Sequence, residues 1–165
     1  MGGADAFESI VGRIDYPMFV VTTAVGDERA GCLVGFAAQG SIRPPRFVVG
    51  VSDKNRTYRV LKSAEALAVH LVPEGAHAIV DLFGGETGDE TDKFARCSWR
   101  AGPEGLPLLD DCPSWFAGRI LERVRLGDHM GHLIEPFAGE DPDASASGGW
   151  YPFSEAKRIE PGHEA

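Results

Sequence analysis

The residues whose types could bind a ligand gather between Ala30 and Thr57. Five small residues come before the Pro44-Pro45 pair: Gly31, Gly35, Ala37, Ala38 and Gly40. Small residues let the backbone approach a flat ligand closely. In a strand, however, they can also mark only a β-bulge or a barrel corner. This stretch therefore has a binding interpretation and a structural one.

A basic, polar turn follows the next strand-like segment. It contains Lys54, Asn55, Arg56 and Thr57 and precedes a helical pattern. A helix N-terminus presents unpaired N–H groups and a partial positive charge, which favour an anion such as phosphate. The alternative is a solvated turn in which Asn55 is a helix cap. If both stretches bind, one ligand with a flat ring and a phosphate would satisfy them.

The histidines and carboxylates do not predict a metal site. His129 and His132 are three residues apart in a strand pattern, so their side chains point to opposite faces. His129 follows the Gly127-Asp128 turn and could reach a cleft, whereas His132 is expected to be half-buried. The acidic loop at 86–92 lacks the spacing of a calcium loop. Lys93 could pair with this loop or reach a ligand phosphate.

Composition and missing motifs exclude several classes of protein. The net charge of −9 and the lack of a basic stripe argue against a nucleic-acid partner. Cys32, Cys97 and Cys112 form no C-x-x-C and favour a reducing cytoplasm. Neither a signal sequence nor an apolar run of about 18 residues is present, so no export or membrane span is expected. Phosphate-loop, nucleophile-elbow and dinucleotide-binding motifs are absent, which disfavours kinases and hydrolases.

The patterning predicts mostly strands with short connections. The expected strands are 18–25, 28–35, 46–52, 66–72, 97–102, 115–126 and 129–137, and the expected helices are 55–63 and 74–85, with a helical turn around Lys93. Residues 36–45 are expected to form a tight loop and a Pro-Pro corner. We expect one mainly β domain over 1–165, an antiparallel barrel with a few packed helices. Residues 1–12 and 139–149 are expected to be mobile, and 161–165 to be a tail.

Four segments together resemble the flavin reductase-like family, the FMN-binding split barrels. They are YPMFVVTTAV, AGCLVGFAAQGSIRPPRFVVGVSDKNRTYRVL, KFA and GDHMGHLIEP. With the Phe83-Gly84 helix end, they give in order a hairpin ending in a Gly-rich strand, a Pro-Pro pair, an Arg-Thr helix entrance, a Phe-Gly helix end and a Gly-Asp-His turn. The resemblance covers most of the chain and implies an antiparallel Greek-key split β-barrel.

The resemblance also implies roles for individual residues. Along the isoalloxazine and ribityl chain it places Leu33, Val34, Gly35, Phe36, Ala37, Ala38 and Gln39, mainly through backbone atoms. For the phosphate it implies Lys54, Asn55, Arg56 and Thr57, and for the other side of the flavin Phe83, Gly84 and Lys93. His129 would face the nicotinamide as the catalytic residue. The family commonly has Thr at 33 and Ser at 35 and 36, so Leu33, Gly35 and Phe36 remove hydroxyl contacts.

The implied function is hydride transfer from NAD(P)H to FMN or FAD. This chemistry needs two flat rings held face to face, which agrees with the absence of a hydrolytic motif. The resemblance further implies a homodimer whose two-fold interface lies near the flavin. A partner oxygenase is a further hypothesis. Alternatives are a non-enzymatic flavin-binding carrier or sensor, and a split barrel that uses a deazaflavin, haem or pyridoxal phosphate. The sequence does not choose between NADH and NADPH.

Overall fold

The computed structural model describes residues 1–144 and 149–159 of the chain. The helices are α1 (Gly3–Val11), α2 (Arg56–Leu61), α3 (His77–Gly85) and α4 (Phe153–Ala156), with the 3-10 turns η1 (Lys93–Ala95) and η2 (Pro103–Gly105). The strands are β1 (Phe19–Val25), β2 (Glu28–Val34), β3 (Ala37–Ser41), β4 (Arg46–Ser52), β5 (Ala66–Leu71), β6 (Trp99–Ala101), β7 (Pro107–Leu109), β8 (Trp115–Arg125) and β9 (His129–Glu140). The predicted mainly β fold is confirmed.

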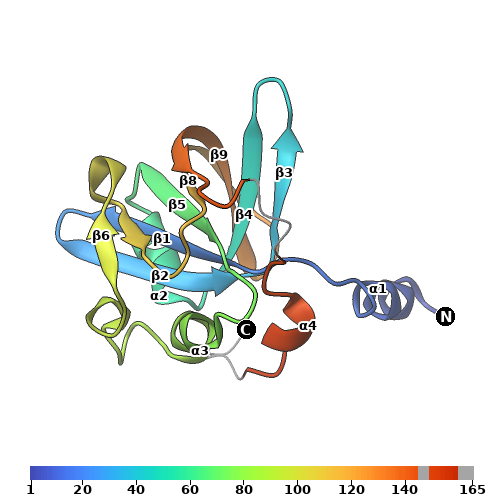
Figure 1. Cartoon of the computed structure of the whole chain (residues 1–165). Coiled ribbons are helices and arrows are strands. Elements are labelled where there is room, and N and C mark those ends of the chain that lie inside the picture. The colour runs from blue at the N-terminus through green and yellow to red at the C-terminus, as the bar shows by residue number, and fades with distance from the viewer. Residues whose placement is uncertain (145–148, 160–165) are drawn as a thin grey trace.

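In the described residues, seven of the strands form one antiparallel sheet in the order β2-β1-β5-β8-β9-β4-β3 (Figure 1). Its two edge strands, β2 and β3, follow each other in the chain with only Gly35 and Phe36 between them. Three peptide units from Val34 to Ala37 span at most about 11 Å. The sheet must therefore curl until its edges approach each other, which makes a barrel with a seam at Gly35 and Phe36.

The seam is held by one backbone hydrogen bond to β4 and one within the connection itself. The Gly50 N–H of β4 donates to the Phe36 carbonyl at 2.7 Å, and the Ala37 N–H donates to the Gly35 carbonyl at 3.1 Å. Gly50 leaves little room there, since a Cβ at this position would lie 3.3 Å from Phe36. The chain thus passes from one sheet edge to the other in a fixed conformation.

Buried side chains of the strands and helices form three clusters in the described residues, two of which include residues next to the seam. The barrel interior contains Val21, Val49, Leu67 and Ile134, which alternate with outward-facing neighbours on their strands. A second group lies between the sheet and α3 and includes Val20, Leu82 and Phe83. The apolar positions predicted for the 74–85 helix supply this contact, so the amphipathic reading of that segment is confirmed.

Residues 37–41 form strand β3, so the prediction of a loop at this place was wrong. Ala37, Ala38 and Gln39 pair with Val49, Val48 and Phe47 of β4. The side chains of β3 are small or polar and mostly exposed, so the sequence lacks the alternation that marks a half-buried strand. The ladder to β4 forms the strand, and this is a tertiary contact that local sequence does not reveal.

The ends of the chain contain two further elements. Residues 1–12, expected to be mobile, include helix α1, which projects away from the barrel with none of its residues buried (Figure 1). At the other end, β9 continues to Glu140, into the predicted mobile segment, and α4 follows Pro152. Positions 145–148 and the predicted tail at 161–165 lie outside the described residues. No helix within the described ranges is long and apolar enough to cross a bilayer.

Candidate functional site

The seam opens into a cavity of about 300 Å³, which we call the slot. Its lining includes eight residues that the sequence assigned to the site: Leu33, Val34, Gly35, Phe36, Asn55, Phe83, Gly84 and His129. They come from the end of β2, the start of α2, α3 and the start of β9. The fold therefore brings together four stretches that lie far apart in the sequence.

Close packing explains two glycines at the slot. A Cβ at Gly35 would lie 2.8 Å from the Tyr16 ring, and one at Gly84 would lie 2.7 Å from the Leu33 side chain. Both distances are too short for a real contact, so neither position accepts a side chain without a shift. These two glycines are therefore needed for packing within the protein. The same packing keeps the backbone at the slot surface.

The His129 side chain is half-buried at the start of β9 and is fixed by its neighbour. Its Nδ1 lies 2.7 Å from Asp128 Oδ1, and this hydrogen bond lowers the pKa of the Asp128 carboxyl group. The His129 and Phe36 rings are 4.9 Å apart between centroids, at an interplanar angle of 57°. Phe36 is 59% exposed, so this pair forms an accessible aromatic edge of the slot.

His132 lies on the other face of β9 and does not share a site with His129. It is fully buried, more than the half-burial predicted, and its Nδ1 lies 3.3 Å from the Val49 carbonyl oxygen. Burial lowers the pKa of this imidazole. Within the described residues, no group of three His, Cys, Asp or Glu side chains has an arrangement that could hold a metal ion.

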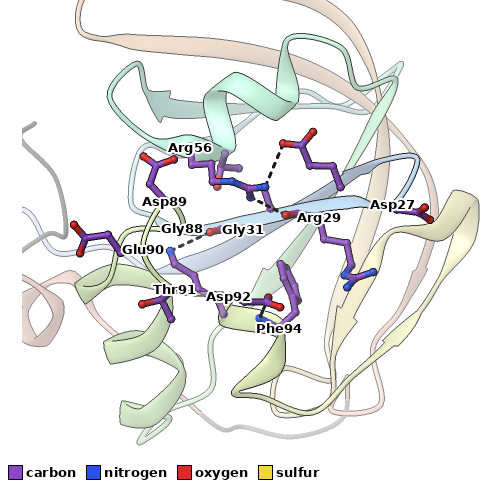
Figure 2. A pocket seen from close by; sticks show the side chains of 14 residues that line it. Asp27, Arg29, Gly31, Arg56, Gly88, Asp89, Glu90, Thr91, Asp92 and Phe94 are labelled. Atoms are coloured by element: carbon purple, nitrogen blue, oxygen red, sulfur yellow. Dashed lines mark hydrogen bonds and ion pairs between the residues drawn. The ribbon is translucent and has the colours of Figure 1, made fainter.

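Arg56, Thr57 and Lys93 line a second, polar cavity of about 410 Å³, shown in Figure 2. Its other lining groups include carboxylates of the β1–β2 turn and of the 88–92 loop. Arg56 points toward that turn: Nη1 donates to the Arg29 carbonyl oxygen at 2.8 Å, and Nη2 lies 3.2 Å from Glu28 Oε1. In this conformation the Arg56 charge is paired with a carboxylate.

Lys93 lies between the slot and the polar cavity and is almost fully buried. Its Nζ donates to the carbonyl oxygens of Gly31 and Phe83, both at 3.2 Å. Gly31 belongs to the polar cavity and Phe83 to the slot, so the ammonium group connects β2 with α3 at the boundary. Burial lowers the pKa of Lys93. In the described part of the chain its hydrogen bonds go to carbonyl groups rather than to the acidic loop.

Comparison with known proteins identifies the fold family. Residues 11–150 match the family described as Flavin reductase like domain. The chain belongs to this family. The flavin reductase-like domain is 30% identical over 126 residues to the "FMN reductase (NADH) RutF" of Methylorubrum extorquens, covering 76% of this chain and 61% of that protein. It is 28% identical over 114 residues to a "Probable flavin reductase" of Rhizobium meliloti, covering 67% of this chain and 36% of that protein.

A solved structure has the same fold. The NADH:FAD oxidoreductase SgcE6 of Streptomyces globisporus C-1027 superimposes with a TM-score of 0.80 at 20% identity, over 91% of this chain and 88% of that chain. The split-barrel fold is thereby confirmed. The domain spans less than two thirds of the length of the Methylorubrum and Rhizobium relatives.

Four of the assigned residues line neither cavity: Ala37, Ala38, Gln39 and Lys54. The first three lie on β3 beyond the seam, and Lys54 lies in the turn after β4. Conversely, the slot is lined by residues that the sequence did not assign: Tyr16, Met18, Phe153, Ala156, Lys157 and Ile159. Tyr16 and Met18 belong to the YPMFVVTTAV segment, but no role was assigned to them, and no local motif distinguishes the residues that follow Pro152.

Proposed function

We propose that this flavin reductase-like domain binds FMN or FAD in the slot and transfers hydride to it from NAD(P)H. The observation that carries the proposal is the convergence of Leu33–Phe36, Phe83-Gly84 and His129 on one apolar cavity at the seam. The names of the curated relatives agree with it, and they favour FMN and NADH. The assignment of each residue to the site is part of the proposal.

The lining of the slot suits a flat, partly apolar ring. Aromatic and aliphatic side chains form most of the surface, and polar or charged groups are added by Ser52, Asn55, Glu86, His129 and Lys157. Such a mixed lining is typical of cofactor pockets, where apolar contacts give affinity and a few polar groups give orientation. A bound flavin would supply the hydride-accepting ring. The protein would exclude water and orient the two rings.

The polar turn is proposed to hold the flavin phosphate. Asn55 caps α2, since its side chain accepts the Thr57 N–H at 2.9 Å, so the capping interpretation of this residue is confirmed. Phosphate binding by residues 54–57 would therefore be a second role of this turn, in addition to the cap. For Arg56 it would require exchange of the Glu28 partner for the phosphate. The Arg56 guanidinium group would then be paired with an oxyanion both before the exchange, with the Glu28 carboxylate, and after it, with the phosphate.

The first experiment is a spectrum. The purified protein is mixed with FMN, excess flavin is removed, and the visible absorbance is recorded before and after anaerobic addition of NADH or NADPH. Retained absorbance that bleaches on a catalytic timescale supports a reductase and identifies its donor. If no flavin is retained, the same donors are tested with FMN as a free substrate. Failure of both assays would contradict the proposed function.

A flavin-binding carrier or sensor is the second candidate. It is favoured by Leu33, Gly35 and Phe36, which offer no hydroxyl group where the family commonly has Thr or Ser. Under this alternative the protein retains FMN, and the flavin stays oxidised with both nicotinamides. Parallel titrations with a deazaflavin, haem and pyridoxal phosphate test the other ligands, and FMN should bind tightest if the main proposal is correct.

We also propose a homodimer in the cytoplasm that transfers reduced flavin to a partner oxygenase. Exposed apolar side chains support the dimer: Phe7, Ile10 and Val11 on α1, Leu121 and Val124 on β8, and Phe137 on β9. Free thiols at Cys32, Cys97 and Cys112 fit a reducing compartment. Faster product formation by a flavin-dependent oxygenase on addition of this protein and NADH would support the transfer.

A further inference from the structure

One wall of the slot is built by a segment beyond the family match. That match ends at residue 150, and α4 with its flanking residues follows. Phe153, Ala156, Lys157 and Ile159 line the slot from this side. Figure 1 shows α4 at the same end of the barrel as α3, whose residues Phe83 and Gly84 line the slot as well. The cavity is therefore completed by residues that the family pattern does not include.

Backbone hydrogen bonds attach this segment to the barrel. The Tyr151 N–H donates to the Val72 carbonyl at 2.9 Å, and the Tyr151 carbonyl accepts the Met18 N–H at 2.8 Å. The Tyr151 side chain is buried, with its hydroxyl group 3.0 Å from His77 Nδ1. Tyr151 thus occupies a place between the start of β1 and the end of β5. An attachment of this kind gives the residues after it a fixed starting point.

A second set of contacts fixes α4 against residues 15 and 16. The Phe153 and Tyr16 rings are stacked, with centroids 4.6 Å apart and an interplanar angle of 10°, and the Phe153 N–H donates to the Tyr16 carbonyl at 2.8 Å. Ser154 donates to the Asp15 carboxylate through its N–H at 3.0 Å and through its hydroxyl group at 2.7 Å. Tyr16 in turn packs against Gly35 at the seam.

We propose that the stacked Tyr16–Phe153 pair and α4 form a specificity wall that recognises the apolar dimethylbenzene edge of the flavin ring. This inference rests on the proposed function. The wall offers aromatic and aliphatic surface from Tyr16, Phe153 and Ala156, and Lys157 follows at the end of α4. The other polar groups are Ser52, Asn55 and His129, from β4, the α2 cap and β9, and Glu86 after α3. An isoalloxazine has one apolar and one polar edge, and the two kinds of lining match these edges.

The test compares FMN with 7,8-didemethyl-FMN, which lacks the two methyl groups of that edge. Equilibrium binding is followed by quenching of flavin fluorescence, so no turnover is needed. The native protein should bind FMN about 3- to 15-fold more tightly, the range expected from burying two methyl groups. Phe153→Ala should weaken FMN binding about 3- to 10-fold. It should also bring the ratio of the two dissociation constants close to one.

Three further variants keep this test decisive. Ile42→Ala truncates an apolar side chain that is 76% exposed, between β3 and β4, and should leave both dissociation constants unchanged. Phe153→Leu keeps an apolar side chain at this position if the alanine variant unfolds, and it should reduce the preference partly. Ser154→Ala leaves the lining intact but removes the hydroxyl hydrogen bond to Asp15, one of the two that hold α4 there, and it should weaken FMN binding. If the native protein binds FMN and the Phe153 variants keep its preference for FMN over 7,8-didemethyl-FMN, the inference alone is overturned. If the native protein binds no flavin, the proposed function is overturned.

Discussion

At the scale of single residues, His129 is the side chain with the most direct proposed role in the reaction. Its ring is held by Asp128 and contacts Phe36 at the edge of the slot. We expect His129→Ala to raise the KM for the nicotinamide, or to slow hydride transfer, about 2- to 10-fold, the effect of losing one hydrogen bond. Flavin affinity should change little. Steady-state kinetics and a fluorescence titration of FMN measure the two quantities separately.

Asp128→Asn provides the matched comparison for His129. It leaves the imidazole in place but exchanges the charged partner of Nδ1 for a neutral amide. If Asp128 only orients the ring, this variant should shift the KM for the nicotinamide in the same direction as His129→Ala and by a smaller factor. Kinetics unchanged in both variants would remove His129 from the site.

The burial of His70 leads us to expect that the free energy of unfolding depends on pH. It is fully buried, and it accepts the Leu109 N–H at Nε2 while Nδ1 lies 3.0 Å from the Val20 carbonyl oxygen. Burial lowers the pKa of His70 to about 4. The unfolded chain therefore binds a proton between about pH 6.5 and pH 4 that the folded chain does not. The free energy of unfolding should fall as the pH drops through this range, by roughly 3 kcal/mol in total.

Urea unfolding between pH 4 and pH 7.5 measures this effect. His70→Gln keeps a donor and an acceptor but cannot titrate, so its unfolding free energy should depend less steeply on pH in the same window. The comparison uses slopes rather than absolute stabilities, since the variant is expected to be less stable at every pH. Equal slopes for the native protein and the variant would contradict the assignment to His70.

At the scale of elements, Lys93 connects η1 with both β2 and α3. Its ammonium group donates to the Gly31 and Phe83 carbonyl groups from a buried position. Lys93→Met keeps much of the side-chain volume but leaves both carbonyl oxygens without this donor. We expect a loss of about 1–3 kcal/mol in the free energy of unfolding, measured by urea denaturation. Flavin affinity should fall as well, because Phe83 lines the slot.

Lys93→Arg is the control for charge at this position. It retains donors and should be less destabilising than Lys93→Met if hydrogen bonding is what the lysine contributes. A Lys93→Met protein as stable as the native one, with weakened flavin binding, would show instead that the side chain acts on the ligand. That result would support the phosphate or ring contact that the family resemblance implies.

The elements that sequence predicted correctly are those with strong local signals. The β1–β2 hairpin has a turn at Gly26, whose φ of +59° suits glycine, and α2 has the Asn55 cap. The elements it missed have no such signal. β3 depends on pairing with β4, and β7 is a three-residue strand that pairs only with β6 in the described residues. α4 has four residues and is defined by its contacts with Asp15 and Tyr16.

The candidate site shows the same division. Residues of contiguous motifs, such as Leu33–Phe36 and Phe83-Gly84, line the slot. The orientation of Arg56 toward Glu28 and the bonding of Lys93 to two carbonyl groups depend on neighbours that are distant in the sequence. Tyr16 and Phe153 meet only because the chain end packs against the start of β1. Sequence motifs therefore give the residues of a site more readily than their partners.

At the scale of the whole molecule, the exposed apolar face of α1 predicts a dimer. Phe7, Ile10 and Val11 lie three and four residues apart, so they share one side of the helix, and they are between 39% and 64% exposed. A nine-residue helix is marginal in water unless its apolar side is covered by another surface. The barrel of the same chain does not cover it, since α1 projects outward with no buried residue (Figure 1). We expect a second copy to provide the surface, for which β8 offers exposed Leu121 and Val124.

Light scattering coupled to size-exclusion chromatography tests this at micromolar concentration. The native protein should have twice the mass of the 17.7 kDa chain. Phe7→Ser combined with Ile10→Ser should raise the dissociation constant of the dimer at least tenfold, because each buried apolar side chain contributes about 1.5–3 kcal/mol. Ser9→Ala, an exposed change on the same helix, should leave the mass unchanged. A native monomer at this concentration would contradict the dimer, and a dimer insensitive to the double variant would place the interface on the barrel strands alone.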